Sequence, residues 1–137
     1  GSKNILELHG NIWQVRCTKE DTVSDNFEFP LPVIPPRCSS CEAILRPNVV
    51  WFGEALPRET LEKAYAASSA AEVLFVVGTS AYVQPAASLP LVAADAGAKI
   101  VEINPDCTPL SVYADFSFRG KAGEILMQVE TLLGNAA

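Results

Sequence analysis

The fold of this 137-residue chain is decided by the stretch Val73-Leu74-Phe75-Val76-Val77-Gly78-Thr79-Ser80. Its first five residues form an uninterrupted apolar run, of the kind found in a parallel strand that is covered on both faces. A glycine and two hydroxyl residues follow directly. Such an ending is typical of α/β folds, in which ligands bind beyond the carboxyl ends of the strands.

The segments on both sides of this strand alternate between helix and strand patterns. A helix is predicted from Pro57 to about residue 71, because proline suits a first helical turn and Glu59 favours the helix dipole. A second helix is expected from Pro85 to Gly97, which Pro90 must kink or split. Further elements are expected downstream: strands over 99–103 and 115–118, and a last helix over 123–133. This order predicts a parallel sheet with helical crossovers, a partial Rossmann-like α/β fold.

The first third of the chain has a different character. Apolar and polar residues alternate over residues 5–16, which predicts two short strands with a bend at His9 and Gly10. Four prolines between residues 30 and 36 exclude a helix or central strand there. Residues 43–52 are expected to be extended. We therefore divide the chain into three parts: a strand-bend segment (1–16), a loop-rich cysteine module (17–45) and the Rossmann-like part (46–137).

Composition narrows the class of protein. The length suits one domain with a hydrophobic core. The net charge of -6, with no run of lysine or arginine, argues against a nucleic-acid surface. No apolar stretch is long enough for a membrane span, and no signal peptide is recognised. The four cysteines are therefore interpreted as reduced thiols of a cytoplasmic protein.

Cys38 and Cys41 have the spacing of a zinc knuckle, in which two thiolates occupy one side of a tetrahedron. Cys17 lies at the distance expected for the second half of a ribbon, but Glu20 stands where its partner cysteine would be. Three sulfurs and one carboxylate are an uncommon structural set. Loss of the metal, a redox pair, or a turn held only by packing are the alternatives.

Polar and small residues follow three strands of the predicted sheet. They are Gly78-Thr79-Ser80, Asn104-Pro105-Asp106 and Arg119-Gly120-Lys121-Ala122. Each alone is most simply a turn. Three of them at consecutive strand ends predict a nucleotide site, although the chain has no glycine-rich dinucleotide or P-loop motif.

His9 is the only histidine of the chain. A lone histidine is more often a packed or surface residue than a catalyst. Its place beside Gly10 at a bend favours a catalytic role, because a general base needs an exposed ring nitrogen and a pKa near the working pH.

Together these motifs resemble the C-terminal part of a sirtuin, the family of NAD-dependent protein-lysine deacylases. The matching pieces follow the family's order along nearly the whole chain: Leu8-His9-Gly10, the cysteine module from Cys17 to Cys41, Leu45-Arg46-Pro47, Val50-Trp51-Phe52-Gly53-Glu54, Val77-Gly78-Thr79-Ser80, Pro85-Ala86-Ala87, Ile103-Asn104 and Gly120-Lys121-Ala122. The run Val50 to Glu54 is especially similar to the bacterial and mitochondrial branch, which removes acidic acyl groups as well as acetyl.

The resemblance implies roles for individual residues. His9 would be the general base that deprotonates a ribose hydroxyl of NAD. Residues implied to contact NAD are Gly78, Thr79, Ser80, Asn104, Lys121 and Ala122. Residues implied to bind the acyl-lysine protein substrate are Val50, Trp51, Phe52, Gly53, Glu54 and Val83. Zinc would be held by Cys17, Cys38 and Cys41, with no fourth cysteine.

The resemblance also implies what activity to expect of this chain by itself. A sirtuin has roughly a hundred further residues ahead of the position of His9, which include its phosphate loop and the segment that handles nicotinamide. We therefore expect deacylation of acetyl-, succinyl- or malonyl-lysine by the full-length protein, and an inactive or nearly inactive 137-residue chain that self-associates through an uncovered sheet edge. A non-catalytic nucleotide-binding or protein-interaction module is the alternative.

Overall fold

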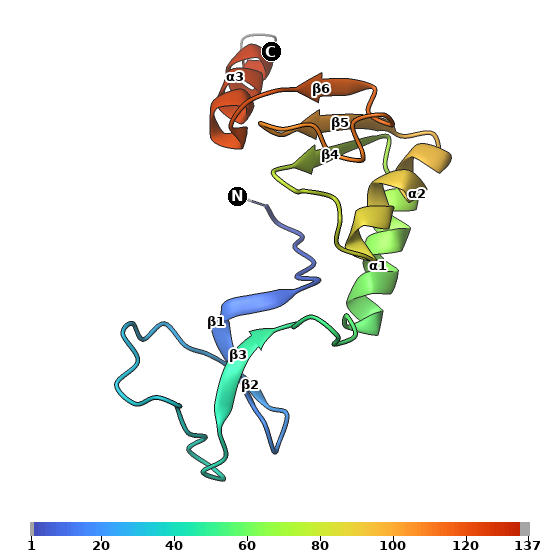
Figure 1. The fold of residues 1–137 in the computed structure, drawn as a ribbon. Coiled ribbons are helices and arrows are strands. Elements are labelled where there is room, and N and C mark those ends of the chain that lie inside the picture. The colour runs from blue at the N-terminus through green and yellow to red at the C-terminus, as the bar shows by residue number, and fades with distance from the viewer. Residues whose placement is uncertain (1, 135–137) are drawn as a thin grey trace. The chain divides into compact units, whose positions relative to one another are not determined.

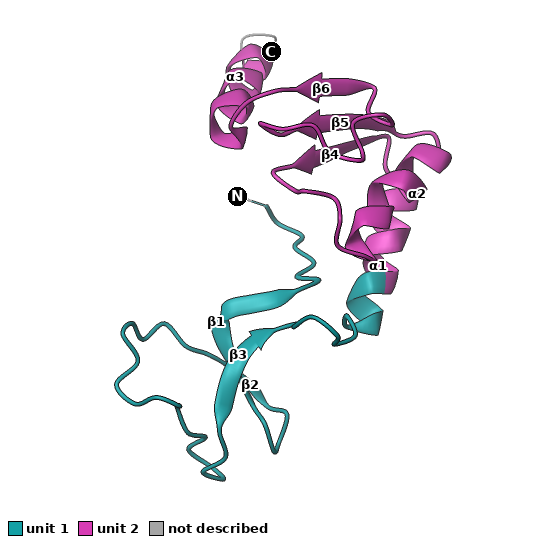
Figure 2. Cartoon of the chain, viewed as in Figure 1, with its two compact units in different colours: residues 1–61 teal, residues 62–137 magenta. Residues whose placement is uncertain are grey.

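The computed structural model describes residues 2–134. The chain forms two compact units, residues 1–61 and 62–137, which Figure 2 shows in two colours. The first contains an antiparallel sheet and the second a parallel one. Within the described part, no helix has both the length and the apolar character needed to cross a bilayer.

Unit 1 is built on three antiparallel strands in the order β2-β1-β3: β1 (Gly10–Cys17), β2 (Val23–Asp25) and β3 (Leu45–Val49). The central strand pairs Gln14 with Asp25 on one side and Cys17 with Leu45 on the other. A bulge lies between Asn11 and Val15, where the register with β3 shifts. The long proline-containing loop joins β2 to β3 at one end of this sheet (Figure 1).

Two expectations for this region are corrected. The alternating residues before His9 form no strand; Leu8 and His9 lie in a turn, closed by the Gly10 amide donating to the Glu7 carbonyl at 3.1 Å. Alternation alone does not make a strand, because a strand needs a neighbour with which to pair. The extended segment expected over 43–52 ends at Val49, and Phe52 and Gly53 already belong to a turn.

The parallel sheet of unit 2 confirms the predicted α/β class. Its strands β4 (Val73–Val77), β5 (Lys99–Ile103) and β6 (Phe116–Phe118) run in the same direction, side by side in Figure 1. The helices are α1 (Arg58–Ser69), which begins in unit 1, α2 (Leu89–Asp95) and α3 (Ala122–Gly134). As Pro90 predicted, the segment from residue 85 is split, into the short 3-10 helix η1 (Ala86–Ser88) and then α2.

Val101 and Ile103 of β5 are buried on one face of the sheet, and the hydrophobic cluster of unit 2 lies on the other face. Val76 and Ile100 pack there with Ala93 of α2, which is fully buried. The alternate residues of β4 remain accessible, with Val73 51% and Phe75 50% exposed. The prediction that this strand is covered on both faces is therefore wrong for the described chain. An apolar run shows that a strand can be buried on both faces, but it does not show which segment would pack against each face.

Candidate functional site

His9 is exposed and stands at the tight turn that precedes β1. Gly10 follows with φ +78°, and a Cβ there would lie 2.0 Å from the carbonyl oxygen of Asn48. Only glycine allows the two backbones to approach so closely. The His9 carbonyl accepts a hydrogen bond from the Val50 amide at 3.0 Å. The candidate base is therefore tied to the first residue of the candidate substrate segment.

The three cysteines of the loop-rich module meet at one end of β1. The Sγ atoms of Cys17 and Cys41 are 3.5 Å apart, and Cys38 and Cys17 are buried. Glu20, which sequence reasoning left as a gap in the ligand set, lies in the same cluster: one ligand atom from each of Cys17, Glu20, Cys38 and Cys41 falls within 4.8 Å of the others. The structure thus brings all four positions together.

The geometry of this cluster fits a zinc ion. With Zn–S bonds of about 2.3 Å, neighbouring sulfurs of a tetrahedral site lie about 3.8 Å apart. The Cys38 Sγ to Glu20 Oε2 distance of 3.9 Å and the Cys17 to Cys41 distance of 3.5 Å are close to this value. Three thiolates and a carboxylate are all ligands that zinc accepts. The ligand distances therefore favour a four-ligand site that includes Glu20.

Ser40 organises the carboxylate corner of the cluster. Its hydroxyl donates to Glu20 Oε2 at 2.7 Å and lies 3.1 Å from Cys38 Sγ. Hydrogen bonds from the Ser40 side chain and backbone, with that of the Cys41 backbone, lower the pKa of Cys38 to about 7. A partner of this kind fixes the orientation of a ligand, as is usual around protein metal sites.

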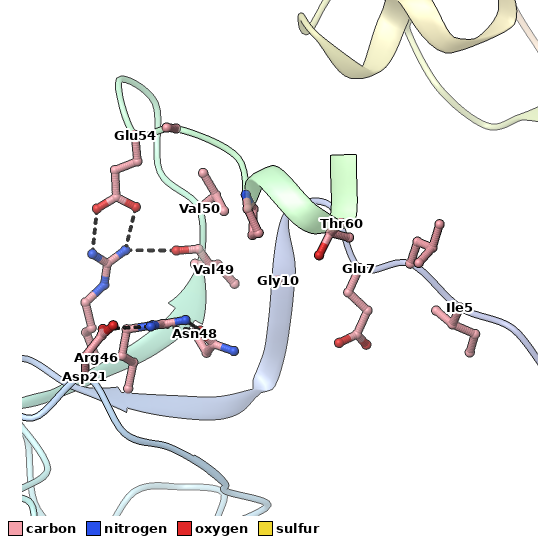
Figure 3. Close-up of a pocket in the computed structure, with 14 residues that line it drawn as sticks. Ile5, Glu7, Gly10, Asp21, Arg46, Asn48, Val49, Val50, Glu54 and Thr60 are labelled. Carbon is pink, nitrogen blue, oxygen red and sulfur yellow. Dashed lines mark hydrogen bonds and ion pairs between the residues drawn. The ribbon is translucent and has the colours of Figure 1, made fainter. Parts of the chain in front are cut away.

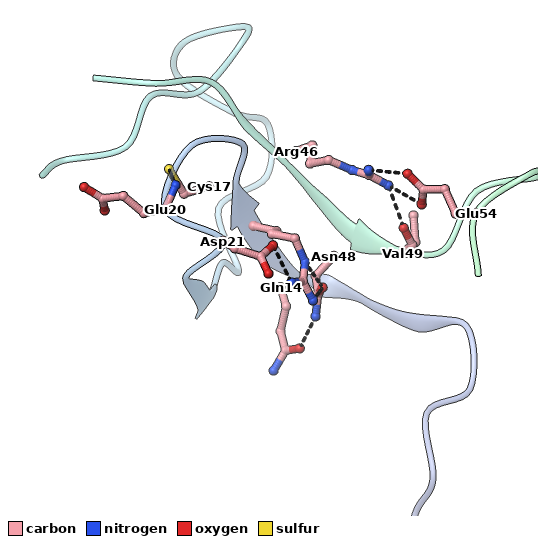
Figure 4. A network of polar contacts seen from close by, with 9 residues as sticks. Gln14, Cys17, Glu20, Asp21, Arg46, Asn48, Val49 and Glu54 are labelled. Atoms are coloured by element: carbon pink, nitrogen blue, oxygen red, sulfur yellow. Dashed lines mark hydrogen bonds and ion pairs between the residues drawn. The ribbon is translucent and has the colours of Figure 1, made fainter. Parts of the chain in front are cut away.

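The candidate substrate segment is shaped by a polar contact that joins β3 to the turn beyond it. Arg46 pairs with Glu54 through both terminal nitrogens, at 2.6 and 2.9 Å, and its guanidinium lies 4.0 Å from the centroid of the Trp51 ring. Glu54 also accepts the Trp51 amide at 2.9 Å. The hydrogen bonds from Arg46, and after them the one from the Trp51 amide, lower the pKa of Glu54 to about 2. Figure 4 shows the two-pronged contact.

A pocket of about 870 Å³ opens beside this ion pair within unit 1 (Figure 3). Arg46 and Glu54 form part of its wall, together with Glu7 of the N-terminal segment and Thr60 at the start of α1. In Figure 3 the paired side chains lie on the opposite side of β1 from Glu7. The turn that carries Trp51 to Glu54 is therefore bordered by open volume and not by a packed core.

In unit 2 the polar residues that follow the three strands lie within hydrogen-bonding distance of one another. The Asn104 side chain, which is 9% exposed, donates to the carbonyl of Thr79 at 2.7 Å and accepts the Asp106 amide at 3.1 Å. The Asn104 carbonyl in turn accepts the Gly120 amide at 3.4 Å. The ends of all three strands are thus linked through Asn104, whose side chain reaches the end of β4 and whose backbone bonds to residues at and beyond the end of β6.

The remaining predicted residues of unit 2 surround this junction. Gly78 has φ +64°, and open space surrounds the position a Cβ would take there. Ser80, Val83 and Lys121 are exposed, and Ala122 begins α3. The exposed amides and hydroxyls of a strand end, with no side chain at Gly78 to block approach, fit a ribose or phosphate. The carbonyl of Val83 accepts the amide of Ala87 in η1 at 3.0 Å.

Glu102 is a structurally central residue that sequence reasoning missed. It is 1% exposed and accepts hydrogen bonds from Thr108 and Ser111, with an ion pair to Arg119 at 2.7 Å. Burial alone would raise the pKa of Glu102, but these contacts outweigh it and lower the pKa. A lone acid inside Lys99–Ile103, followed by hydroxyl residues and an arginine, is the signal that could have indicated this network. The hydrogen-bond network of Glu102 orders the chain between β5 and α3.

Comparison with known proteins places these features in context. The Sir2 family model matches residues 1–85. An NAD-dependent protein deacylase of Aquifex aeolicus is 50% identical over 129 residues, covering 94% of this chain and 54% of that protein. NAD-dependent protein deacylase 1 of Archaeoglobus fulgidus is 51% identical, covering 92% and 51%. The chain therefore spans about half the length of the curated relatives it matches.

Solved structures give the same answer. A Sir2 homologue in complex with NAD superposes with a TM-score of 0.94 at 46% identity, covering 99% of this chain and 53% of its own. A Sir2 protein bound to a propionylated peptide superposes with a TM-score of 0.88 at 34% identity, covering 98% and 58%. Both likenesses extend over nearly the whole chain.

Proposed function

This chain belongs to the Sir2 family, and from that premise we propose that it carries the base, peptide-binding and adenosine-binding parts of an NAD-dependent protein-lysine deacylase. The proposed reaction converts an acyl-lysine, NAD and water to lysine, nicotinamide and O-acyl-ADP-ribose. The observation that carries the proposal is the convergence of the motif residues within each unit, at the turn of His9 and at the ends of three parallel strands. The whole reaction belongs to the protein at its natural length.

The adenosine side of the site is proposed for unit 2. Gly78, Thr79 and Ser80 would contact the ribose and phosphates, and Asn104 the adenosine ribose. The burial of Asn104 and its bond to Thr79 support this, because a fixed amide holds the strand end in one conformation before NAD binds. Lys121 and Ala122 would border the adenine. Bound NAD supplies the ADP-ribose group that accepts the acyl oxygen, with nicotinamide as leaving group.

The substrate side is proposed for unit 1. The segment Val50 to Glu54 would bind the substrate peptide as an added strand, a mode in which main-chain hydrogen bonds give affinity and neighbouring pockets give selectivity. Val50 and Phe52 would line the channel for the acyl-lysine side chain, and Val83 is proposed as a further substrate-binding residue. Acetyl is the proposed acyl group, with succinyl and malonyl as further candidates.

His9 is proposed as the general base. Its exposed ring can take a proton from a ribose hydroxyl, and its backbone is fixed to Val50 by the 3.0 Å hydrogen bond. This bond holds the base at a constant place relative to the start of the peptide-binding segment. The chemistry therefore depends on the Gly10 turn as well as on the imidazole.

Zinc is proposed as a structural ion, held by Cys17, Cys38, Cys41 and Glu20. It would join the end of β1 to the turn between Cys38 and Cys41, in a loop-rich module that has few buried apolar residues of its own. Closed sites of this kind stabilise a fold and do not react.

Two further proposals concern the setting of the protein. The four unpaired cysteines support a cytoplasmic location, where thiols stay reduced. The 137-residue chain is proposed to pair with a second copy through the free edge of β4, a strand on which Val73 and Phe75 lie exposed. Strictly monomeric elution at high concentration would contradict this pairing.

A His9→Ala variant of the natural-length protein tests the proposal. A deacylase loses turnover of an acyl-lysine peptide by about a hundredfold or more, since a positioned base contributes that much, while its affinity for NAD stays nearly unchanged. A non-catalytic nucleotide-binding module would keep its function in this variant. Asn104→Ala is the complementary change, for which weaker NAD binding is expected.

A further inference from the structure

The turn that follows β3 has no packed core to define it. Trp51, Phe52, Gly53, Glu54 and Ala55 are all exposed. The pocket of about 870 Å³ borders the same segment. Apolar burial therefore cannot select one conformation of this turn, and the polar contacts within it must do so.

Those contacts connect Trp51, Glu54 and Arg46 to one another. The Trp51 amide donates to Glu54 Oε2 at 2.9 Å, and the Trp51 carbonyl accepts the Glu54 amide at 3.0 Å. Arg46 holds the same carboxylate with both terminal nitrogens and lies against the Trp51 ring. The backbone and the side chain of Trp51 are thus both fixed by one ion pair.

Arg46 is itself anchored to the strand. One terminal nitrogen also donates to the Val49 carbonyl at 2.8 Å, which ties the guanidinium to the last residue of β3. Among the residues that the structure describes, Arg46 Nε is the buried side-chain nitrogen with no hydrogen-bond partner. Leaving such a donor unpaired costs free energy. The arrangement is therefore better explained if it serves to hold the Arg46 guanidinium in one place than if it serves to stabilise the fold.

We propose that Arg46 and Glu54 are positioning residues of the peptide-binding site, which act by clamping Trp51 and so fix the turn that receives the substrate. This inference rests on the proposed function, since it assigns a role within peptide binding. The clamp engages both backbone groups of Trp51. The substrate peptide would therefore form its strand-like hydrogen bonds with the backbone of Phe52 and Gly53. The Phe52 side chain is 95% exposed.

The test uses Glu54→Gln and Arg46→Met in the natural-length protein, with a propionyl-lysine peptide as probe. Both variants are expected to raise the KM for the peptide about tenfold, because a charge-assisted contact that organises the turn is lost. The kcat at saturating peptide stays within about threefold, and the KM for NAD is unchanged, since neither residue is among those proposed to contact NAD. A role in folding alone would lower the active fraction and leave every KM as it was.

Asp21→Asn is the matched control. It removes the ion pair between Arg16 and Asp21, another pair of unit 1 that borders the same pocket, and asparagine tolerates the positive φ of 58° at this position. The control is expected to bind the peptide as the unaltered protein does. An equal rise in peptide KM for Asp21→Asn and Glu54→Gln would overturn the proposal, because it would show that any loss of charge near the pocket suffices.

A double charge reversal sharpens the test. Arg46→Glu with Glu54→Arg restores an ion pair but leaves the Trp51 amide without its carboxylate acceptor. The clamp predicts that the peptide KM stays high in the double variant. Full recovery would overturn the part assigned to Trp51.

A spectroscopic measurement separates failure of the clamp from failure of the proposed function. The Trp51 backbone amide resonance is expected to shift upfield and to exchange faster with solvent in Glu54→Gln, in the absence of any substrate. Unchanged Trp51 resonances overturn the clamp. A natural-length protein that shows the Trp51 shift but no NAD-dependent deacylation would instead overturn the proposed function, and with it the role in peptide binding.

Discussion

The carbonyl of His9 accepts the amide of Val50 at 3.0 Å, so the candidate base and the first residue of the peptide-binding segment are joined directly. Gly10 makes this contact possible, because it lets β1 start against β3 without a side chain between the two backbones. The proposed catalytic and peptide-binding segments of unit 1 therefore depend on a glycine that takes no part in the proposed reaction.

Gly10→Ala should destabilise the fold by more than about 2 kcal/mol, because the new Cβ would collide with the Asn48 carbonyl in addition to straining φ. Gly97→Ala separates the two causes: its φ is +98°, but open space surrounds the position of the Cβ. Denaturant unfolding should give about 1 to 2 kcal/mol for Gly97→Ala. Equal losses for the two variants would contradict the close approach at Gly10.

The carboxylate of Glu54 should make the protein sensitive to acid. Its pKa lies at about 2 in the folded protein against an ordinary 4.5, chiefly because Arg46 donates to the ionised form. A lowered folded-state pKa contributes stability that is complete above pH 4.5 and is lost as the pH falls toward 2. The unaltered protein should therefore lose more stability over this interval than Glu54→Gln. Titration of the Glu54 carboxyl near pH 4.5, followed by NMR, would contradict the pairing.

The four-ligand metal site predicts one zinc per chain and a part for Glu20. Glu20→Gln should weaken zinc binding at least tenfold in competition with a chromogenic chelator, whereas Glu20→Cys should retain the metal. Cys107→Ser is the control, because Cys107 is exposed and lies outside the cluster. Removal of zinc by a chelator should lower the unfolding temperature. Zinc binding that survives Glu20→Gln unchanged would remove the carboxylate from the ligand set.

Glu102→Ala should destabilise the protein by about 3 kcal/mol, because it leaves Arg119 and three hydroxyls without their buried partner. It should also weaken NAD binding, since the chain between β5 and α3 loses its anchor. Glu130→Ala, which alters an exposed acid of α3, should change stability by less than about 0.5 kcal/mol. Calorimetry and NAD titration of both variants check this, and normal NAD affinity in Glu102→Ala would contradict the ordering role.

Elements with strong local patterns were predictable from sequence. The apolar runs of β4 and β5 and the proline that opens the region of α1 gave the parallel sheet and its crossovers close to their observed bounds. Pro90 gave the split between η1 and α2. These patterns act over a few residues, so composition and periodicity suffice to recognise them.

Features that depend on contacts between distant residues were not predictable. Glu102 looked like an ordinary strand residue, because its partners are scattered over the 17 positions up to Arg119. Glu20 was placed by spacing, but only folding shows its carboxylate beside the three sulfurs. The Arg46 and Glu54 contact likewise crosses a turn whose shape no local pattern encodes.

The central claim is that acyl groups leave lysine by transfer to ADP-ribose, and product analysis tests it most directly. The natural-length protein is incubated with NAD and a propionyl-lysine peptide, and the products are identified by mass spectrometry. The account predicts equal amounts of nicotinamide, unmodified peptide and O-propionyl-ADP-ribose. Release of free propionate without consumption of NAD, or an unchanged peptide while NAD is bound, would contradict it.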